Sequence, residues 1–438
     1  MLTMTKQHLH ARSYFIDGVG SAVSPFDSEL PTDLTDFLTR LPASGLSAWV
    51  RGHSGLVGWG ELSRFETKGA DRFADASDFW KQLSAGADVD DAVRLPGSGP
   101  VAFGSFGFSD RTDIPSVLIV PRVVLGRHSG RVWVTTMSFD DEPAPERLGA
   151  PSPLERPRAV TVTAGGRDDW EETVGKVVDR IRAGEAKKVV MARDAAARSD
   201  EPLDVRFLLG HLNAHYPTCW TYHVDGMLGA TPELLVSSHD GAVHSRVLAG
   251  TFYNNSGDHD VDVEAARHVL AKSKDSAEHK YAVDSLVETL SPLCSSLEVD
   301  CEPFLLELPN VIHLASDARG HLTHRSDGSR VSSLEIAAAL HPTAAVGGTP
   351  RGRALELIDE LEATDRGRYA GPVGWIGASG DGEWGLALRG GRLDEDGRGV
   401  RLFAGGGIVG ESVPEYEWLE TVAKLAPMLA ALGVRTER

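Results

Sequence analysis

The alternation of hydrophobic and polar positions predicts strands in the first part of the chain. Apolar runs at 117–120 and 123–125 lead to a turn at His128-Ser129-Gly130, and Val132-Trp133-Val134 follows the turn. Two apolar runs joined by a glycine-containing turn are typical of a β-hairpin. Residues 100–108 read as a further strand with glycine interruptions.

A region rich in proline then interrupts the pattern. Such a region is typical of an extended surface connection. Because strands are predicted on both sides of it, we interpret it as a loop inside one large α/β unit and not as a domain boundary. The prolines are Pro143, Pro145, Pro151, Pro153 and Pro157.

Helical spacing of apolar residues follows this region. Asp168 and Glu171 have the spacing of a capping box at the start of a helix, and Gly184 is expected to end it. The pattern predicts further helices over 276–290 and 353–362, and strands over 375–389 and 399–404. The apolar positions of the first helix are Trp170, Val174, Val177, Val178 and Ile181.

The last helix is expected to begin near Ser412, with Pro414 in its first turn and Glu415 at capping-box spacing. Its polar stripe carries Glu417, Glu420 and Lys424, three and seven residues apart from the first. The plain interpretation is a solvated face with an intrahelical ion pair. The apolar stripe on its other side is Trp418, Val422, Leu425 and Leu429.

The composition excludes several classes of protein. The 438 residues carry a formal net charge of −19, and such an acidic surface repels phosphate backbones, so no nucleic-acid partner is expected. Three cysteines without CxxC spacing indicate a reducing compartment and no disulfide framework. The N-terminus does not resemble a signal peptide, and no apolar run is long enough for a membrane span. A cytoplasmic protein that contacts no membrane is therefore expected.

Carboxylates on two helices suggest a site for a hard cation. Glu278 lies near the start of the 276–290 helix, where a helix-dipole role is the plain interpretation. Together with the carboxylates of the last helix it could instead bind Mg²⁺, which prefers oxygen ligands and keeps several waters. Zinc and calcium signatures, such as HExxH, CxxC or an EF-hand loop, are absent from the sequence.

The glycine-rich segment 405–410 satisfies the GxGxxG pattern between a predicted strand and a helix. A dinucleotide-binding site is nevertheless rejected, because the segment begins at residue 405 of 438 and leaves no room for the rest of the sheet. We interpret it as a tight turn whose backbone N–H groups could hold a carboxylate.

Two residues have the chemistry of proton carriers. Lys188 shares a face of the predicted 187–193 strand with Val190 and Ala192. A lysine there is either an edge residue with its amine in water or a partly desolvated amine that could act as a base. Glu233 follows Thr-Pro and is either a helix-start residue or an acid between apolar neighbours. His313, His341 and Arg389 viewed singly are structural.

The spelling and order of short segments are more specific than any single residue. In chain order they are Lys188-Val189-Val190-Met191-Ala192-Arg193, Gly229 to Leu235, Leu248-Ala249-Gly250-Thr251, Ser273-Lys274-Asp275 with Glu278-His279, Leu340-His341-Pro342-Thr343, Tyr369 to Trp375, Gly382-Glu383-Trp384 with Arg389, Phe403 to Val409, and Glu417 to Thr421 with Lys424. This series resembles the chorismate-utilising enzymes, and within them most closely the isochorismate synthases. The resemblance covers roughly residues 168–435, and the first 165 residues resemble the family only loosely.

The resemblance implies a fold of the α/β (α+β) class. It is a single large chorismate-binding domain with two packed antiparallel β-sheets and helices outside. Residues 1–165 would form the N-terminal part of the sheet framework, and residues 166–438 the catalytic region of the same integrated domain. Family habit and the acidic surface favour a monomer.

The resemblance also assigns roles in converting chorismate to isochorismate. Lys188 resembles the base that activates water for attack at C2, and Glu233 the acid that protonates the departing C4 hydroxyl. Both proton transfers are needed because water is a poor nucleophile and hydroxide a poor leaving group. Tyr369, Arg389 and Lys424 resemble the residues that bind the enolpyruvyl carboxylate.

The remaining pocket residues and the metal ligands follow from the same resemblance. Glu278 and Glu420 resemble direct Mg²⁺ ligands and Glu417 a ligand through water, so that Mg²⁺ would bind the ring carboxylate of chorismate. The other pocket residues are Gly250, Thr251, His313 and Gly405. Gly406 stands where alanine is common in the family.

The branch of the family follows from two positions. Lys188 favours water as the nucleophile, because members that add ammonia usually lack this lysine. Ala249 stands where the aminodeoxychorismate branch typically has a nucleophilic lysine.

Salicylate synthase, which shares the proton carriers Lys188 and Glu233 and then eliminates pyruvate, stays the closest alternative. A non-catalytic chorismate-binding subunit and a nucleotide-dependent oxidoreductase are the alternatives from other classes. Menaquinone and siderophore biosynthesis are both open as the pathway.

Overall fold

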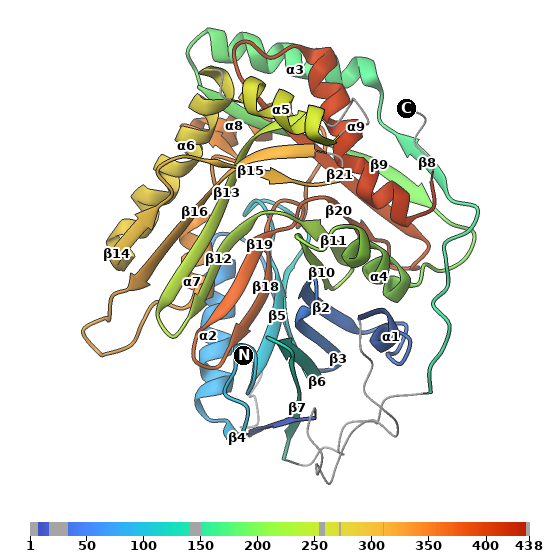
Figure 1. The fold of residues 1–438 in the computed structure, drawn as a ribbon, viewed down its shortest axis with the longest axis vertical. Coiled ribbons are helices and arrows are strands. Elements are labelled where there is room, and N and C mark those ends of the chain that lie inside the picture. The colour runs from blue at the N-terminus through green and yellow to red at the C-terminus, as the bar shows by residue number, and fades with distance from the viewer. Residues whose placement is uncertain are drawn as a thin grey trace.

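The chain folds into a mixed α/β structure built on a large curled sheet (Figure 1). Hydrogen bonds link the strands into one network whose pairings are antiparallel, apart from the parallel pair β1–β4. The α/β class is confirmed, whereas the division into two separate sheets stays a prediction. The computed structural model describes residues 8–16, 34–140, 150–253, 259–270, 273–309 and 311–434.

The elements alternate irregularly along the chain. The strands are β1 Leu9–Phe15, β2 Leu46–Arg51, β3 Ser54–Thr67, β4 Asp88–Asp91, β5 Val101–Ser105, β6 Ser116–His128, β7 Arg131–Phe139, β8 Thr161–Ala164, β9 Lys188–Arg198, β10 Trp220–Val224, β11 Met227–Thr231, β12 Leu234–His239, β13 Ala242–Tyr253, β14 Cys294–Val299, β15 Phe304–Glu307, β16 Val311–Leu322, β17 Gly348–Thr349, β18 Pro372–Gly377, β19 Gly382–Leu386, β20 Gly390–Leu393 and β21 Gly399–Ile408. The helices are α1 Leu34–Leu38, α2 Arg72–Ala85, α3 Arg167–Arg182, α4 Val205–His215, α5 His259–Leu270, α6 Ser273–Leu290, α7 Ser333–Leu340, α8 Arg351–Leu361 and α9 Pro414–Ala431.

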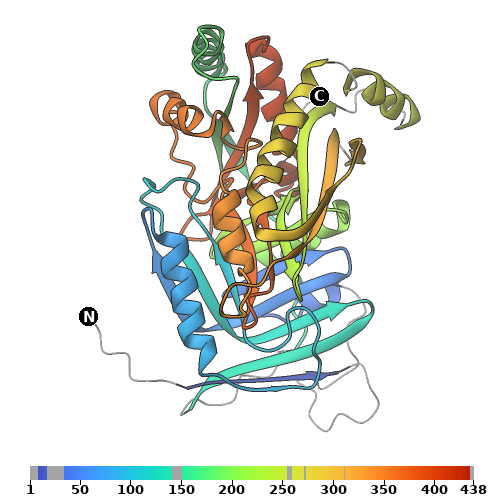
Figure 2. The same ribbon diagram turned by 90° about the vertical axis from the view of Figure 1, so that its left-hand side faces the viewer.

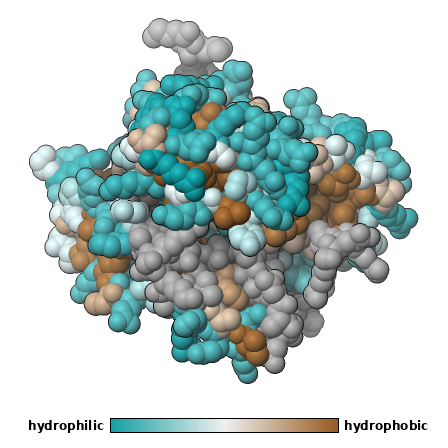
Figure 3. Space-filling model, turned by 90° about the horizontal axis from the view of Figure 1, so that it is seen from above, coloured by the Kyte–Doolittle hydropathy of each residue, from teal (hydrophilic) through white to brown (hydrophobic). Residues whose placement is uncertain are grey.

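Helices cover the outside of the curled sheet. In Figure 1 α3, α5, α6, α8 and α9 lie around the upper part, while the strands from β1 to β7 form the lower part. Figure 2 shows α2 and α7 side by side on one flank. Seen from above, the surface is largely hydrophilic with small hydrophobic areas (Figure 3). No helix among the described residues is long and apolar enough to cross a membrane.

The strongest sequence patterns are confirmed. β6 and β7 form the predicted hairpin, with His128 paired to Arg131. The five apolar residues of α3 are all buried, as their spacing predicts. The part of the proline-rich region that is described, 150–160, has no helix or strand; Pro143 and Pro145 lie outside the described residues. All three cysteines are unpaired.

The predicted N-terminal helix caps are wrong, whereas Gly184 follows the last turn of α3 with φ at +85°, as predicted. α3 begins after Gly166, and no side chain caps it. α9 begins after Val413, again without a side-chain cap; Ser412 instead accepts a hydrogen bond from the backbone N–H of Val409 at 3.1 Å. Pro414 does occupy the first turn, where its missing N–H costs nothing.

The glycine-rich segment is not a turn. Gly405, Gly406 and Gly407 lie inside β21 and pair with β9. A Cβ on Gly405 would lie 2.5 Å from the carbonyl oxygen of Met191, so this position requires glycine because the two strands approach so closely. The segment 375–389 is also not one strand, because β18 and β19 form a hairpin and an irregular stretch follows it.

The first 165 residues share the sheet with the rest of the chain. β5 pairs with β18, where Phe103 lies opposite Trp375. β2 pairs with β10, where Trp49 lies opposite Tyr222. All four side chains are buried. We therefore propose that residues 1–165 and 166–438 form one integrated domain.

A fragment of residues 166–438 expressed alone should not fold, because it would expose the β10 and β18 edges and the apolar residues that pack there. Circular dichroism during urea unfolding would show no cooperative transition for the fragment, and one transition for the whole chain. A fragment that unfolds cooperatively by itself would contradict the proposal.

Candidate active site

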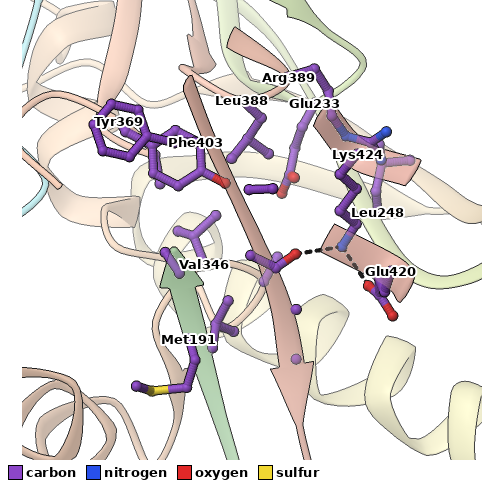
Figure 4. A pocket seen from close by; sticks show the side chains of 18 of the residues that line it. Met191, Glu233, Leu248, Val346, Tyr369, Leu388, Arg389, Phe403, Glu420 and Lys424 are labelled. Carbon is purple, nitrogen blue, oxygen red and sulfur yellow. Dashed lines mark hydrogen bonds and ion pairs between the residues drawn. The ribbon is translucent and has the colours of Figure 1, made fainter. Parts of the chain in front are cut away.

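A cavity opens between β9, β21 and the middle of α9. The hollow holds about 770 Å³ of empty space, including its open mouth. Figure 4 shows its polar side chains gathered on one side and Tyr369 with Phe403 on the other. Nine of the predicted site residues line it: Lys188, Glu233, Gly250, His313, Tyr369, Arg389, Gly405, Glu420 and Lys424.

Lys188 is a buried residue of the cavity wall. It begins β9, pairs with Thr349 of β17, and has only 2 % of its surface exposed. The interpretation as an edge lysine with its amine in water is therefore wrong. Val190 and Ala192, which share its face of the strand, line the cavity with it.

Glu233 is a buried carboxyl group that faces several cations. It lies between β11 and β12, so the alternative of a helix start is wrong. Burial raises its pKa to about 8, although the positive charges of Lys188, Arg389 and Lys424 act in the opposite direction. A carboxyl group with this pKa is largely protonated at neutral pH and can donate a proton.

Arg389 is positioned by a chain of hydrogen bonds that starts at a bulge. Gly250 lies at the register shift of β13, with φ at +82°, a value that suits glycine. The Gly250 carbonyl accepts a hydrogen bond from Nδ1 of His313 at 3.3 Å, and Nε2 of His313 accepts one from Arg389 at 2.7 Å. These two bonds require neutral His313, and burial beside Arg389 keeps its pKa well below the usual range.

Tyr369 forms the aromatic wall. Its ring stacks on Phe403, with the centroids 5.0 Å apart and the planes 12° from parallel. Burial raises the pKa of Tyr369 to about 12, so its hydroxyl stays a hydrogen-bond donor at any physiological pH.

The acidic residues of α9 lie over Gly406. A Cβ on Gly406 would be 3.0 Å from Oε2 of Glu417 and 3.7 Å from Oε1 of Glu420. Lys424 donates hydrogen bonds to Glu420 Oε1 at 2.5 Å and to the Gly405 carbonyl at 2.8 Å (Figure 4). The predicted ion pair is therefore present, but it lines the cavity and is not a solvated face.

These carboxylates fit a divalent cation by the chemistry of their oxygens. Glu417 is 6 % exposed, and its Oε2 would lie 3.0 Å from a Cβ on Gly406, so this carboxylate is buried against the strand next to Glu420. No group of three acidic, histidine or cysteine residues forms a metal cluster in the part of the chain that is described. The side chains of Glu278 and Thr251 lie outside the description, so their predicted roles stay predictions.

Two residues in or near the cavity were not predicted from the sequence. Arg366 lines it beside Tyr369, although only the segment from Tyr369 onward was singled out. Tyr222 donates a hydrogen bond to the Leu388 carbonyl at 3.0 Å and so supports the backbone next to Arg389. Its hydroxyl lies 2.3 Å from where a Cβ on Gly390 would be, which explains that glycine.

The chain belongs to the chorismate-binding enzymes. The model of that family, described as chorismate binding enzyme, matches residues 48–433. The family resemblance is thereby confirmed. It also extends further towards the N-terminus than the 168–435 expected from the motifs.

Two curated relatives and one solved structure illustrate the similarity. The isochorismate synthase DhbC of Bacillus subtilis is 37 % identical, over 69 % of this chain and 75 % of that protein. The salicylate biosynthesis isochorismate synthase of Pseudomonas aeruginosa is 33 % identical, over 88 % and 84 %. MenF, the menaquinone-specific isochorismate synthase from Escherichia coli, superimposes with a TM-score of 0.77 over 97 % of this chain and 95 % of that one; at 23 % identity it shows the fold alone.

The stability of the protein should decrease as the pH rises from about 5 to 8. The pKa of Glu233 is raised to about 8 in the folded chain from 4.5, so folding takes up a proton between these values. The contribution of this carboxyl group is therefore complete below 4.5, decreases as the pH rises, and is lost once the pH passes 8. Urea unfolding across this range would give a flatter profile for Glu233→Gln. Identical pH slopes for both proteins would contradict the assignment.

Proposed function

We propose that the protein is a Mg²⁺-dependent isochorismate synthase, an isomerase that converts chorismate to isochorismate. The observation that carries the proposal is the pair of buried proton carriers, Lys188 and Glu233, in one cavity. The 33 % and 37 % identity to isochorismate synthases supports the same reaction.

The reaction needs one base and one acid at two ring carbons. Lys188 would take a proton from a water molecule as its oxygen bonds to C2 of chorismate. The ring double bonds would shift, and the bond from C4 to its hydroxyl would break as Glu233 gives its proton to the leaving oxygen. One water enters and one leaves, so the product is an isomer. Each positioned proton transfer contributes about 10²–10⁴-fold to the rate.

Other cavity residues would hold the substrate still. Arg389 presents a planar guanidinium whose paired N–H groups suit the enolpyruvyl carboxylate. His313 fixes the orientation of this guanidinium through their hydrogen bond. Tyr369 and Lys424 would contribute further hydrogen-bond donors. The backbone around the substrate ring would come from Gly250, Thr251 and Gly405.

The carboxylates of Glu278, Glu417 and Glu420 would hold the metal ion. Bound Mg²⁺ would supply positive charge that neutralises the ring carboxylate and fixes the ring. Lys424 forms an ion pair with Glu420 and lines the same cavity, so its amine lies beside the carboxylates that would hold the metal.

Three less direct features belong to the same proposal. The cytoplasm is the proposed location, and a monomer the proposed state. The curled sheet would act as two packed antiparallel layers with helices outside.

Salicylate synthase activity is the second candidate, because Lys188 and Glu233 would serve its first step equally well.

Product analysis tests the reaction directly. Purified protein with chorismate and Mg²⁺ should give isochorismate in equilibrium with chorismate, no pyruvate, and no product in EDTA. Pyruvate with salicylate would favour the second candidate. No turnover under any condition would contradict the proposal and favour a non-catalytic chorismate-binding subunit.

Replacing Lys188 with Met should lower kcat by about 10²–10⁴-fold, because the base is lost while the volume of the side chain is kept. Calorimetry should still detect Mg²⁺-dependent chorismate binding. Lys187→Met, at the exposed neighbouring residue, is the matched control and should keep the rate. A retained rate in Lys188→Met would remove this lysine from the mechanism.

Glu420→Ala should lose activity together with the Mg²⁺ dependence of chorismate binding, because one metal ligand is removed. Glu415→Ala is the matched control on the exposed side of the same helix. Titration of Mg²⁺ by calorimetry would measure the change. An unchanged titration would place the metal elsewhere.

A further inference from the structure

The strand that begins with Lys188 lacks a partner strand along part of one edge. On one side β9 pairs with β21 from Val189 to Arg198. On the other side β17 covers residues 188–189 and β8 covers residues 195–198. Among the described residues no strand pairs with positions 190–194 on that side. Buried backbone groups there need other partners.

Two side chains from the segment after α8 fill this gap. Nη2 of Arg366 donates to the Val190 carbonyl at 2.6 Å, and Oε2 of Glu362 accepts from the Ala192 N–H at 2.8 Å. A third bond joins the Val190 N–H to the Gly347 carbonyl at 2.9 Å. One donor and one acceptor therefore stand where a neighbouring strand would present its backbone.

The two side chains also hold each other. Arg366 binds Glu362 through Nε at 2.7 Å and through Nη2 at 2.7 Å, and both side chains are only 3 % exposed. Nη1 of Arg366 donates to the Val346 carbonyl at 3.0 Å, and the guanidinium lies over the ring of Phe108 at 4.2 Å. The pair thus ties β9 to the loop that leads into β17.

The two segments that this pair connects are both neighbours of Lys188, one along its own strand and one in the adjacent strand. Val190 is two residues away on the same strand face, and the loop from Val346 continues into Thr349, which pairs with Lys188. A base must lie within hydrogen-bond reach of the attacking water, and a displacement of about 1 Å can cost about 100-fold in rate.

We propose that Glu362 and Arg366 are positioning residues that replace a missing strand partner of β9 and so hold Lys188 at its working position. The proposal rests on the proposed role of Lys188 as base. Although Arg366 lines the cavity, Nε, Nη1 and Nη2 are all engaged by protein oxygens, which favours a positioning role over substrate binding.

The test uses two variants of the full-length protein. Glu362→Gln keeps the shape but sets an amide donor against the guanidinium. The double variant Glu362→Leu with Arg366→Met removes both charges together, so no buried charge is left without its counter-charge. Asp204→Leu with Arg206→Met, at a similarly buried pair at the start of α4, is the matched control.

Both test variants should lose about 10–100-fold in kcat per folded molecule, with the dissociation constant for chorismate changed by no more than about twofold. Hydrogen exchange followed by mass spectrometry should be faster in the peptide that covers 188–194. The control pair should lower the unfolding midpoint and leave kcat unchanged.

Three outcomes would overturn the proposal. An unchanged kcat would mean that the pair has only a structural role. An unchanged exchange rate at 188–194 would mean that the pair does not hold β9 in place. Weaker chorismate binding at unchanged kcat would make Arg366 a substrate ligand. Failure of the proposed role of Lys188 as base would give a different result, namely full activity in Lys188→Met.

Discussion

The antiparallel pairing of β9 with β21 determines where the reactive groups lie. β9 supplies Lys188 at its first residue, and β21 supplies Gly405, Gly406 and Gly407, which pair with residues 190–192 of β9. Because Gly406 has no side chain, the carboxylates of α9 can lie directly over the strand. A register slip of one residue would turn Lys188 to the other face of the sheet, so this pairing fixes the chemistry as well as the fold.

Charge inside the cavity is opposite in sign to the charge of the whole molecule. The chain carries a net charge of −19, yet Lys188, Arg389 and Lys424 gather around one carboxyl group, Glu233. Burial outweighs their attraction and keeps Glu233 able to hold a proton. An anionic substrate would meet cations and a neutral acid, while the negative charges of Glu417 and Glu420 lie together on α9, where a divalent cation could offset them.

The sequence predicted the site better than it predicted the backbone that builds it. Long periodic segments such as α3 and the β6–β7 hairpin were found because their apolar residues repeat at regular spacing. The N-terminal caps of α3 and α9 were wrong because suitable residues were near those ends but did not occupy the capping positions. The glycines of β21 were mistaken for a turn, since nothing local reveals that another strand lies against them.

Residues whose role depends on distant contacts could not be found at all. Arg366 and Glu362 act on backbone more than 160 positions earlier in the chain, and no spacing rule connects them to Val190 or Ala192. The family motifs did identify nine of the residues that line the cavity, because the resemblance carried contacts that periodicity cannot supply. For Lys188 and Glu233, local reasoning left the edge-lysine and helix-start interpretations open, and only the folded chain excluded them.

Oxygen-isotope transfer tests the central claim, that Lys188 and Glu233 exchange one water for one hydroxyl across the ring. Chorismate would be converted in water enriched in ¹⁸O, with Mg²⁺ present, and isochorismate collected at early times before the reverse reaction mixes the label. The account predicts one ¹⁸O atom at C2 of the product and none elsewhere in the ring. Unlabelled isochorismate would mean that the original hydroxyl migrates within the molecule, and it would contradict the assignment of a water-activating base.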